Sequence, residues 1–435
     1  MTELLSYMNS TNIKKVVLEN GVLILFLLLV LVGLYLRFWN FENSISFGWD
    51  QARDAWKTRD LLVGKWVLDG PRTGVGHFHL GPLWFYLLWP FYYLTGWDPI
   101  GAIYLNFFVN IFNFVALFWV TRKVFSDNAA LFVTFLYAIN REVIEVTQTA
   151  WNVSPIPGVS ALIFYGIYQV VFKEKYKYIP IVAFLTGLFS HLHFSVVFLP
   201  PIIILSFLFA RDKKKVFLTG LVSLPLFLIW FIPNVISEVY TNTGDVNLLQ
   251  NFTKDYYVGG FYGKFFLFRL NDAFIQFHTT IFWPLTNKLL KFILPIIFAI
   301  VVLFEKDRRK KILGILISFW FIVPSVLYTL YGGSTSEYYV LLNWIMVVYI
   351  LYYLQEKLLK TKWRKTLLLC LVIAWSLFTY HQTKDLWVKP EYGGLAKQKD
   401  TAKQATKDQR KIEYNEGVIE SYLYHIWNLD KRPIK

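Results

Sequence analysis

The chain has 435 residues, of which 56% are hydrophobic and 19% aromatic, while only 17% are charged. This composition excludes an ordinary soluble domain and is typical of a polytopic membrane protein. The net charge of +15 reflects Lys and Arg clusters in short connections between apolar runs, the pattern of cytoplasmic loops rather than of a nucleic-acid surface, so we expect no nucleic-acid partner. The single cysteine, Cys370, excludes a disulfide within the chain and a cysteine metal cluster.

The first apolar run, about 16–37, is long enough to cross a hydrocarbon core of roughly 30 Å. It has no small-residue cleavage site, so we expect a retained helix rather than a removed signal. Lys14 and Lys15 precede the run and predict a cytoplasmic N-terminus.

Segment 81–96, "GPLWFYLLWPFYYLTG", is apolar but short, and Pro90 interrupts it. A crossing here would place the basic pair Arg122 and Lys123 outside, whereas a segment that does not span leaves this pair inside. We therefore predict an aromatic helix that lies in the outer interface, with a short spanning helix as the alternative. The interfacial reading makes 38–99 one long outer loop.

The later apolar runs alternate with basic loops and bring the total to about eleven membrane-spanning helices. They cover about 100–120, 128–140, 154–172, two runs between Lys177 and Arg211, 215–233, 288–304, 312–330, 339–356 and 366–380. The predicted fold class is an all-α polytopic membrane protein with interfacial helices in the first outer loop, and membrane lipids are its expected surroundings.

We expect a transmembrane domain over 1–380 and a small extracytoplasmic C-terminal segment over 381–435. The domain includes the first outer loop, 38–99, and a second large outer loop, 234–287. The C-terminal segment contains a polar run with helical character. At about 55 residues it is too small to hold a core unaided, so we expect it to pack on the outer face.

The stretch "SFGWDQARDA", 46–55, places charges in this apolar protein. If 49–62 is helical, Asp50, Arg53 and Asp54 share a face. One interpretation is an exposed ion-pair ladder of little energetic value. The other is that nearby tryptophans hold the helix at the headgroup level, where a carboxylate takes a proton from a hydroxyl and arginines hold a phosphate. These tryptophans are Trp49, Trp56 and Trp66.

Three features in order resemble the C-type superfamily of membrane glycosyltransferases: a first membrane helix, an outer loop that opens with the acid-containing "GWDQARDA", and the Gly/Pro-aromatic "HLGPLWFYLLWPF". The later "GLFSHLHFSVVFLPP" is similar to a histidine-containing turn of many bacterial members. The most similar group is glycosyltransferase family 39, with the protein O-mannosyltransferases and the lipid A aminoarabinose transferase as relatives. The resemblance covers roughly 1–210, and the remainder only by hydropathy.

The resemblance implies a GT-C-like fold and the transfer of a sugar from a polyprenyl-phosphate donor to a hydroxyl of a lipid, glycan or protein. It also implies an integral protein of a prokaryotic plasma membrane, with the active site and the C-terminus extracytoplasmic. Carried over, Asp50 matches the acid assigned as catalytic base. Many relatives have a second acid directly after it, where this chain has Gln51. A lone carboxylate gives a divalent metal few ligands, and Asp54 is the candidate replacement, so a metal cofactor is left open.

A departing sugar phosphate is an anion, so the site needs cations for it. The candidates in the first outer loop are Arg53, Arg72, His77 and His79. For the two histidines the alternative is an interface residue bonded to backbone.

Two outer turns supply the remaining candidates. His193 matches the histidine of the family, whereas His191 does not, and the two make an unconvincing zinc pair without a third ligand nearby. Trp151 and Asn152 follow the apolar run 128–140 and are candidates for sugar binding, with a solvated turn as the alternative.

Two other functions compete with a glycosyltransferase. A flippase or transporter for a lipid-linked saccharide would need charges inside the spans and broken helices, whereas the ionisable residues here lie almost entirely in loops. A glycan polymerase or ligase shares the aromatic outer loops, and the sequence leaves it open.

Overall fold

The structure is a computed structural model of the chain, and it describes residues 10–45, 47–61, 63–74, 76–256, 266–268, 270–271, 290–330, 362–388, 394–407 and 422–423. Within these ranges the regular structure is helical, and β pairing is confined to an isolated bridge between Arg72 and His79. The predicted all-α class is confirmed.

The longer helices follow the predicted apolar runs. They are α2 (Ser10–Phe38), α6 (Ile100–Val124), α7 (Asp127–Ile139), α9 (Ile156–Lys173), α10 (Tyr178–Ser190), α11 (Leu199–Phe207), α12 (Lys213–Leu228), α16 (Leu290–Phe304), α17 (Arg308–Tyr328) and α19 (Lys362–Val388). Shorter elements connect or flank them: α3 (Phe41–Ser44), α4 (Trp49–Asp60), α5 (Leu83–Leu94), α8 (Arg141–Gln148), η1 (Phe194–Phe198), η2 (Ile229–Phe231), α13 (Ile232–Thr241), α14 (Asp245–Tyr256) and α20 (Leu395–Lys407).

Five helical stretches in the described part are long and apolar enough to cross a membrane. They are Asn20–Phe38, Ile100–Val124, Ile156–Lys173, Lys213–Thr241 and Arg308–Tyr328. With 12 residues, α5 is shorter than the roughly 20 that a crossing takes, which agrees with its predicted place outside the spans. The predicted run 339–356 lies outside the described residues, and the total of about eleven spans stays a prediction.

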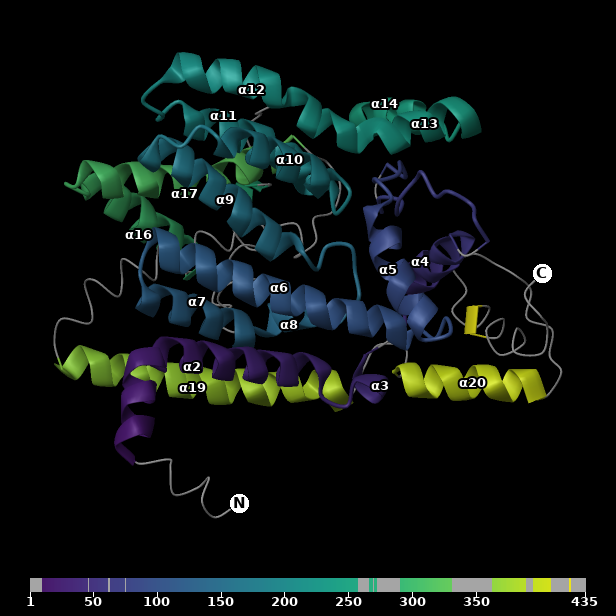
Figure 1. Ribbon diagram of the computed structural model, residues 1–435, viewed down its shortest axis with the longest axis horizontal. Helices are drawn as coiled ribbons and strands as arrows, with labels where there is room; N and C mark the ends of the chain where they lie inside the picture. The colour runs from purple at the N-terminus through teal and green to yellow at the C-terminus, as the bar shows by residue number, and fades with distance from the viewer. Residues whose placement is uncertain are drawn as a thin grey trace.

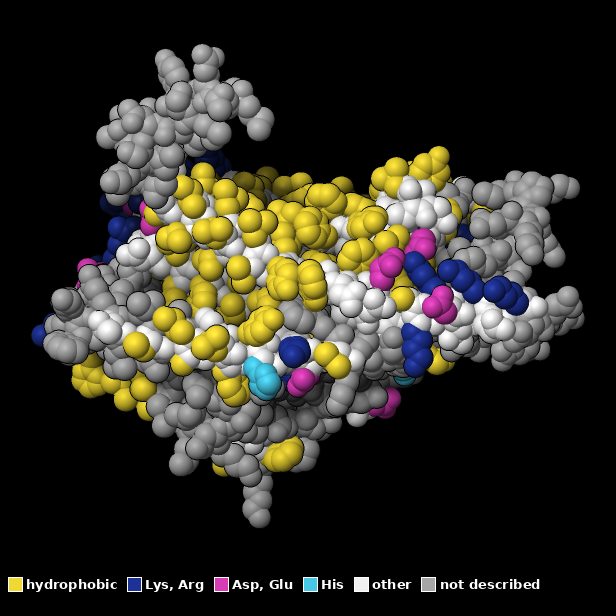
Figure 2. All heavy atoms as spheres, turned by 90° about the horizontal axis from the view of Figure 1, so that it is seen from below, with side chains coloured by type: hydrophobic (Ala, Val, Ile, Leu, Met, Phe, Trp, Pro, Cys, Tyr) yellow, Lys and Arg dark blue, Asp and Glu magenta, His cyan; other side chains and the backbone are white. Residues whose placement is uncertain are grey.

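The helices stack in layers, as Figure 1 shows. Along one side α2 packs against α6 and α7, and α19 packs against α7 and α8. The helices α9, α10 and α12 follow, while α4 and α5 gather at one end. Figure 2 shows the α2 side, where hydrophobic side chains cover the middle of the face. Leucines of α2, among them Leu27 and Leu31, are half exposed or more, as expected of side chains that face lipid.

Polar side chains mark where several helices begin. Ser126, Asp212 and Asp307 each accept a hydrogen bond from the backbone N–H three residues later, at the starts of α7, α12 and α17. Such N-caps satisfy amide groups that the first helical turn leaves without a partner. The predicted loops therefore carry the local signals that end one helix and start the next.

A stripe of buried asparagines on α6 holds the connection between α8 and α9. Asn106 and Asn110 donate to the carbonyl of Thr147 at 2.7 and 2.8 Å, and Asn113 donates to the carbonyl of Ser154 at 2.7 Å. The stripe thus joins α6 to the end of α8 and to the α8–α9 connection through backbone carbonyls. Trp151 lies between the two anchored carbonyls, so its position is fixed from both sides.

The C-terminal segment packs against the first outer loop, and α19 continues through the expected domain boundary at 380. At the start of α20 the backbone N–H of Leu395 donates to the carbonyl of Ile45 at 2.9 Å. The Gln398 amide accepts from the N–H of Phe47 at 3.0 Å and donates to its carbonyl at 2.9 Å. The tail is thus joined to the residues just before α4.

The same packing corrects one expectation about the tryptophans of this loop. Trp49 and Trp66 are 55% and 82% exposed, as expected of residues at an interface, but Trp56 is only 6% exposed. Its ring packs edge-on against Tyr422, with centroids 5.2 Å apart. The expectation that Trp56 faces the headgroups is wrong, because the C-terminal segment covers it.

Candidate active site

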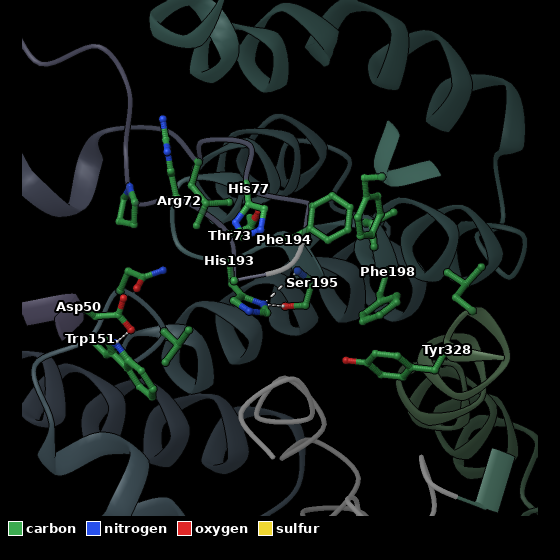
Figure 3. A pocket seen from close by; sticks show the side chains of 18 of the residues that line it. Asp50, Arg72, Thr73, His77, Trp151, His193, Phe194, Ser195, Phe198 and Tyr328 are labelled. Atoms are coloured by element: carbon green, nitrogen blue, oxygen red, sulfur yellow. Dashed lines mark hydrogen bonds between the residues drawn. The ribbon is translucent and has the colours of Figure 1, made fainter. Parts of the chain in front are cut away.

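A cavity of about 850 Å³ opens where the first outer loop meets the α8–α9 connection, η1, α14 and the end of α17. All the predicted site residues except Asp54 and His79 line it. Figure 3 shows Asp50 and Trp151 on one side of it, Arg72 and His77 on another, and Phe198 with Tyr328 opposite Asp50. Charged groups thus occupy one end of the cavity and apolar ones the other.

Asp50 lies in the first turn of α4, where the helix dipole favours a negative charge. Its side chain is 41% exposed. Oδ1 accepts from Arg53 Nη1 at 2.7 Å and Oδ2 accepts from Trp151 Nε1 at 3.1 Å, the latter drawn in Figure 3. Two elements distant in sequence therefore set the orientation of this carboxylate.

Gln51 follows Asp50 at the position where the sequence resemblance implied a second acid, and its side chain bonds to the backbone. Its Oε1 accepts the N–H of Gly48 at 2.9 Å, which caps the start of α4. Its Nε2 donates to the carbonyl of Ala150 at 3.3 Å, next to Trp151. Gln51 thus ties the helix that carries Asp50 to the connection that carries Trp151.

Arg53 is shared between a cavity carboxylate and a buried one. Besides Asp50, it donates through Nε and Nη2 to Oδ1 of Asp54 at 2.9 and 2.7 Å. Asp54 is 1% exposed and lies off the cavity. Burial raises the pKa of Asp54 to about 6, and the nearby Arg53 opposes that rise. The structure therefore places Asp54 behind Arg53 and away from the cavity.

The segment from Arg72 to His79 forms a tight hairpin at the cavity edge, with the β-bridge between its two ends. His77 has a positive φ of 56° and is exposed to the cavity. His79 is turned away: its Nε2 accepts from Arg72 Nε at 2.9 Å and its Nδ1 lies 2.9 Å from Oδ1 of Asp245. Of the two candidate histidines, only His77 is brought to the cavity.

His193 lies at the middle of the cavity wall, and Figure 3 shows its bond to Ser195. The backbone N–H of Ser195 donates to His193 Nδ1 at 3.0 Å, so a neutral ring carries its proton on Nε2. Burial lowers the pKa of His193 to about 3. His193 is therefore a neutral hydrogen-bond donor and not a cation.

Asn152 and His191 both hold the cavity wall through hydrogen bonds to backbone groups. Asn152 lines the cavity and donates through Nδ2 to the carbonyl of Leu192, beside His193. His191 does not line it: its Nδ1 accepts the N–H of Leu83 at 3.2 Å. Its ring lies so close to Gly81 that a Cβ there would come within 2.3 Å of the imidazole. His191 thus joins the turn between α10 and η1 to the start of α5.

Several lining residues were not among the predicted site residues. Phe194 and Phe198 come from η1, Phe252 from α14 and Tyr328 from the end of α17. In the sequence they read as ordinary apolar positions. Only their packing around one cavity identifies them.

The described residues do not fit a divalent metal. They contain no group of three or more His, Cys, Asp or Glu side chains placed to hold an ion. The two nearest carboxylates, Asp50 and Asp54, are bridged by the guanidinium of Arg53, which puts a positive charge where a cation would have to bind.

Comparison of the sequence with protein-family models gives no match, and comparison with curated proteins gives none either. The structure is similar to that of ArnT from Cupriavidus metallidurans bound to undecaprenyl phosphate, with 13% identity, a TM-score of 0.57, and coverage of 94% of this chain and 76% of that one. The apo state of the same protein is similar at 14% identity and a TM-score of 0.55, over 94% of this chain and 75% of that one.

The apo oligosaccharyltransferase from Archaeoglobus fulgidus is similar at 16% identity and a TM-score of 0.54, over 93% of this chain and 60% of that one. Both neighbours have the GT-C fold. The chain therefore has the fold of the GT-C membrane glycosyltransferases, as the sequence resemblance implied, and it is an integral membrane protein.

Proposed function

We propose that this protein transfers a sugar from a polyprenyl-phosphate donor to a hydroxyl acceptor at the extracytoplasmic face of the membrane. The observation that carries the proposal is that a carboxylate, Asp50, and a cation, Arg72, face one cavity from different segments of the first outer loop. Transfer from a phosphate ester needs both, a base for the acceptor and positive charge for the leaving group.

In the proposed reaction the acceptor oxygen attacks the anomeric carbon while its proton passes to Asp50. The bond between the anomeric carbon and the phosphate oxygen breaks, and polyprenyl phosphate leaves with the electron pair. Trp151 and Arg53 hold the carboxylate in place for this step. The products are the glycosylated acceptor and polyprenyl phosphate.

The other lining residues suit the donor. Arg72 and His77 are exposed to the cavity and are the proposed phosphate contacts, and neutral His193 lines the same cavity. The apolar end, with Phe198 and Tyr328, suits a prenyl chain. ArnT, one of the similar structures, is bound to undecaprenyl phosphate, which supports a donor of this class.

The proposed orientation follows from the basic loops. Lys and Arg clusters on the connections predict that those loops, and the N-terminus, are cytoplasmic. The first outer loop, the cavity and the C-terminal segment are then extracytoplasmic. A lipid-linked donor and an acceptor from the water side both reach the outer surface of the membrane. The proposed membrane is a prokaryotic plasma membrane.

Purified protein incubated with a labelled polyprenyl-phosphate monosaccharide tests the proposal. We expect thin-layer chromatography to show the label leaving the lipid donor and entering a lipid, glycan or protein acceptor, with release of polyprenyl phosphate. Movement of intact labelled donor across a vesicle membrane, without bond cleavage, would instead indicate a flippase.

A second candidate, transfer of a whole lipid-linked glycan, is favoured by the likeness to an oligosaccharyltransferase. The cavity of about 850 Å³ is large enough for more than one sugar. A donor with several sugars, compared with the monosaccharide donor at equal concentration, separates the two. Faster turnover of the larger donor would favour the ligase.

A further inference from the structure

A row of hydrogen bonds runs from the first residue of α14 to a cation of the cavity. Asp245 Oδ1 lies 2.9 Å from Nδ1 of His79, and the other ring nitrogen of His79 accepts from Arg72 Nε at 2.9 Å. Arg72 lines the cavity, whereas the His79 and Asp245 side chains are only 8% and 16% exposed. The row therefore joins the second outer loop to a cavity side chain of the first.

The chemistry of the three groups fixes where the protons lie. A guanidinium only donates, so Nε2 of His79 has to be the acceptor, and the neutral ring carries its proton on Nδ1. That proton is then donated to Asp245, whose charge makes Nε2 a better acceptor for Arg72. Each group thus fixes the orientation of the next.

The acidic end of the row is itself anchored. The backbone N–H of Asp245 donates to Glu238 at 2.9 Å, and Asp245 Oδ1 also accepts the backbone N–H of His79 at 3.2 Å. Asn234 donates through Nδ2 to the carbonyls of His79 and Leu80 at 3.3 and 3.0 Å. The second outer loop therefore forms hydrogen bonds to both the backbone and the side chain at the His79 end of the hairpin.

This anchoring matters because Arg72 is long and exposed. An arginine that must be ordered by its ligand loses rotamer freedom on binding, which weakens the complex. The bond through Nε directs the side chain before the ligand arrives. Within the described part of the chain both terminal nitrogens remain available for the two oxygens of a phosphate.

We propose that His79 and Asp245 are positioning residues that hold Arg72 ready for the donor phosphate, so that the second outer loop contributes to donor binding. The inference rests on the proposed function, in which Arg72 contacts that phosphate. The competing explanation is that the pair only fastens the two loops together, with Asp69, 3.6 Å from His79 Nε2, as a further partner of the ring.

The two explanations differ in a double-mutant cycle on polyprenyl-phosphate affinity, measured with undecaprenyl phosphate in detergent. Replacing His79 by Phe keeps a ring but removes both bonds, and we expect about tenfold weaker binding. In an Arg72→Ala background the same change should cost nothing more, because its effect acts through Arg72. His79→Gln, which both accepts and donates, should restore most of the affinity.

Two matched controls accompany the cycle. Asp255 is an exposed carboxylate of the same helix as Asp245, and Asp255→Asn should leave affinity unchanged, whereas Asp245→Ala should weaken it. Lys65 is an exposed cation of the first outer loop outside the cavity, and Lys65→Ala should weaken binding less than Arg72→Ala.

Three results would overturn the inference. An equal loss from His79→Phe in both backgrounds would mean that His79 acts through loop folding, and unchanged affinity in the wild-type background would mean that it has no role. Unchanged affinity of Arg72→Ala would remove the phosphate contact itself. Sugar transfer by the wild-type protein, measured separately, would then still support the transferase, so the two failures are distinguishable.

Discussion

The indole Nε1–H of Trp151 donates to Oδ2 of Asp50 over 3.1 Å, a contact between residues 101 positions apart. It joins the α8–α9 connection to the first turn of α4. Arg53 holds the other oxygen at 2.7 Å, so the carboxylate is fixed by a neutral and a charged donor from two elements. This geometry leads to the first two predictions.

Replacing Asp50 by Asn keeps the shape of the side chain and removes the proton acceptor. General-base help is typically worth about 10² to 10⁴ in rate, so turnover should fall by that order while donor affinity stays nearly unchanged. Asp54→Asn, off the cavity, should reduce turnover less. An Asp50→Asn protein with wild-type turnover would show that the group is only part of an ion pair.

Trp151→Phe tests the orientation of that carboxylate. It removes the indole donor but keeps an aromatic ring, and a lost bond to a charged group should lower turnover about tenfold. The effect should fall on turnover more than on donor affinity, because the contact is to the base. Trp66→Phe, at an 82% exposed tryptophan of the same loop, is the control and should be silent.

Asp54 makes a pH-dependent contribution to stability. Its folded pKa of about 6 lies above its ordinary value of 3.8, so between these values the folded state binds more protons than the unfolded state. The free energy of unfolding from this group therefore falls as pH rises through that window, by about 3 kcal/mol in order of magnitude. The stabilising contribution of Asp54 is therefore fully present below about pH 4 and lost above about pH 6.

Thermal unfolding in detergent at a series of pH values measures this pH-dependent contribution of Asp54 to stability. The Tm of Asp54→Asn relative to wild type should increase from pH 4 to pH 7, because the amide carries no charge to bury. A difference in Tm that is constant over this range would contradict the raised pKa.

Gln398 is expected to support α4 from the C-terminal segment. Its two bonds to the backbone of Phe47 end one residue before the Gly48 cap of α4. Removing them with Gln398→Ala leaves two buried backbone groups without a partner and should cost roughly 1–3 kcal/mol of stability. Lys397→Ala, at the exposed neighbour, should change neither Tm nor turnover.

The sidedness of segment 81–96 can be measured with single cysteines in a Cys370→Ala background. A cysteine at Trp66, before the segment, and one at Asp98, after it, should react with an impermeant reagent from the same side, because α5 has only 12 residues. A cysteine at Lys123, in the last turn of α6, should react from the other side. Labelling of Trp66 and Asp98 from opposite sides would mean that α5 spans.

The sequence alone determined the helices and the place of one acid. Helices such as α6 and α17 follow from apolar length, and their starts from capping residues such as Asp307, because both signals lie within a few positions of each other. Asp50 was likewise identified from its own surroundings, as an acid at the beginning of a short polar helix after the first span. The likeness in fold was also predictable, since it rests on the order of such elements.

Only the tertiary structure decided which neighbours of Asp50 share the cavity. Asp54 lies one turn away on a helix, yet α5 covers it, and Arg53 stands between it and the cavity. His77 and His79 would face the same way in a regular strand, but the positive φ at His77 turns the chain, so one faces the cavity and the other Asp245.

Lining residues from the second half of the chain could not be predicted from the sequence either, because contacts between distant segments bring them to the cavity. Phe252 reaches the cavity because α14 packs against the first outer loop, and Tyr328 because α17 packs against α11 and η1. Nothing within their own segments marks them. Hydropathy and capping report on contacts between near neighbours in the chain. A binding site forms from contacts between distant segments, and those are fixed only when the buried side chains of the helices pack together.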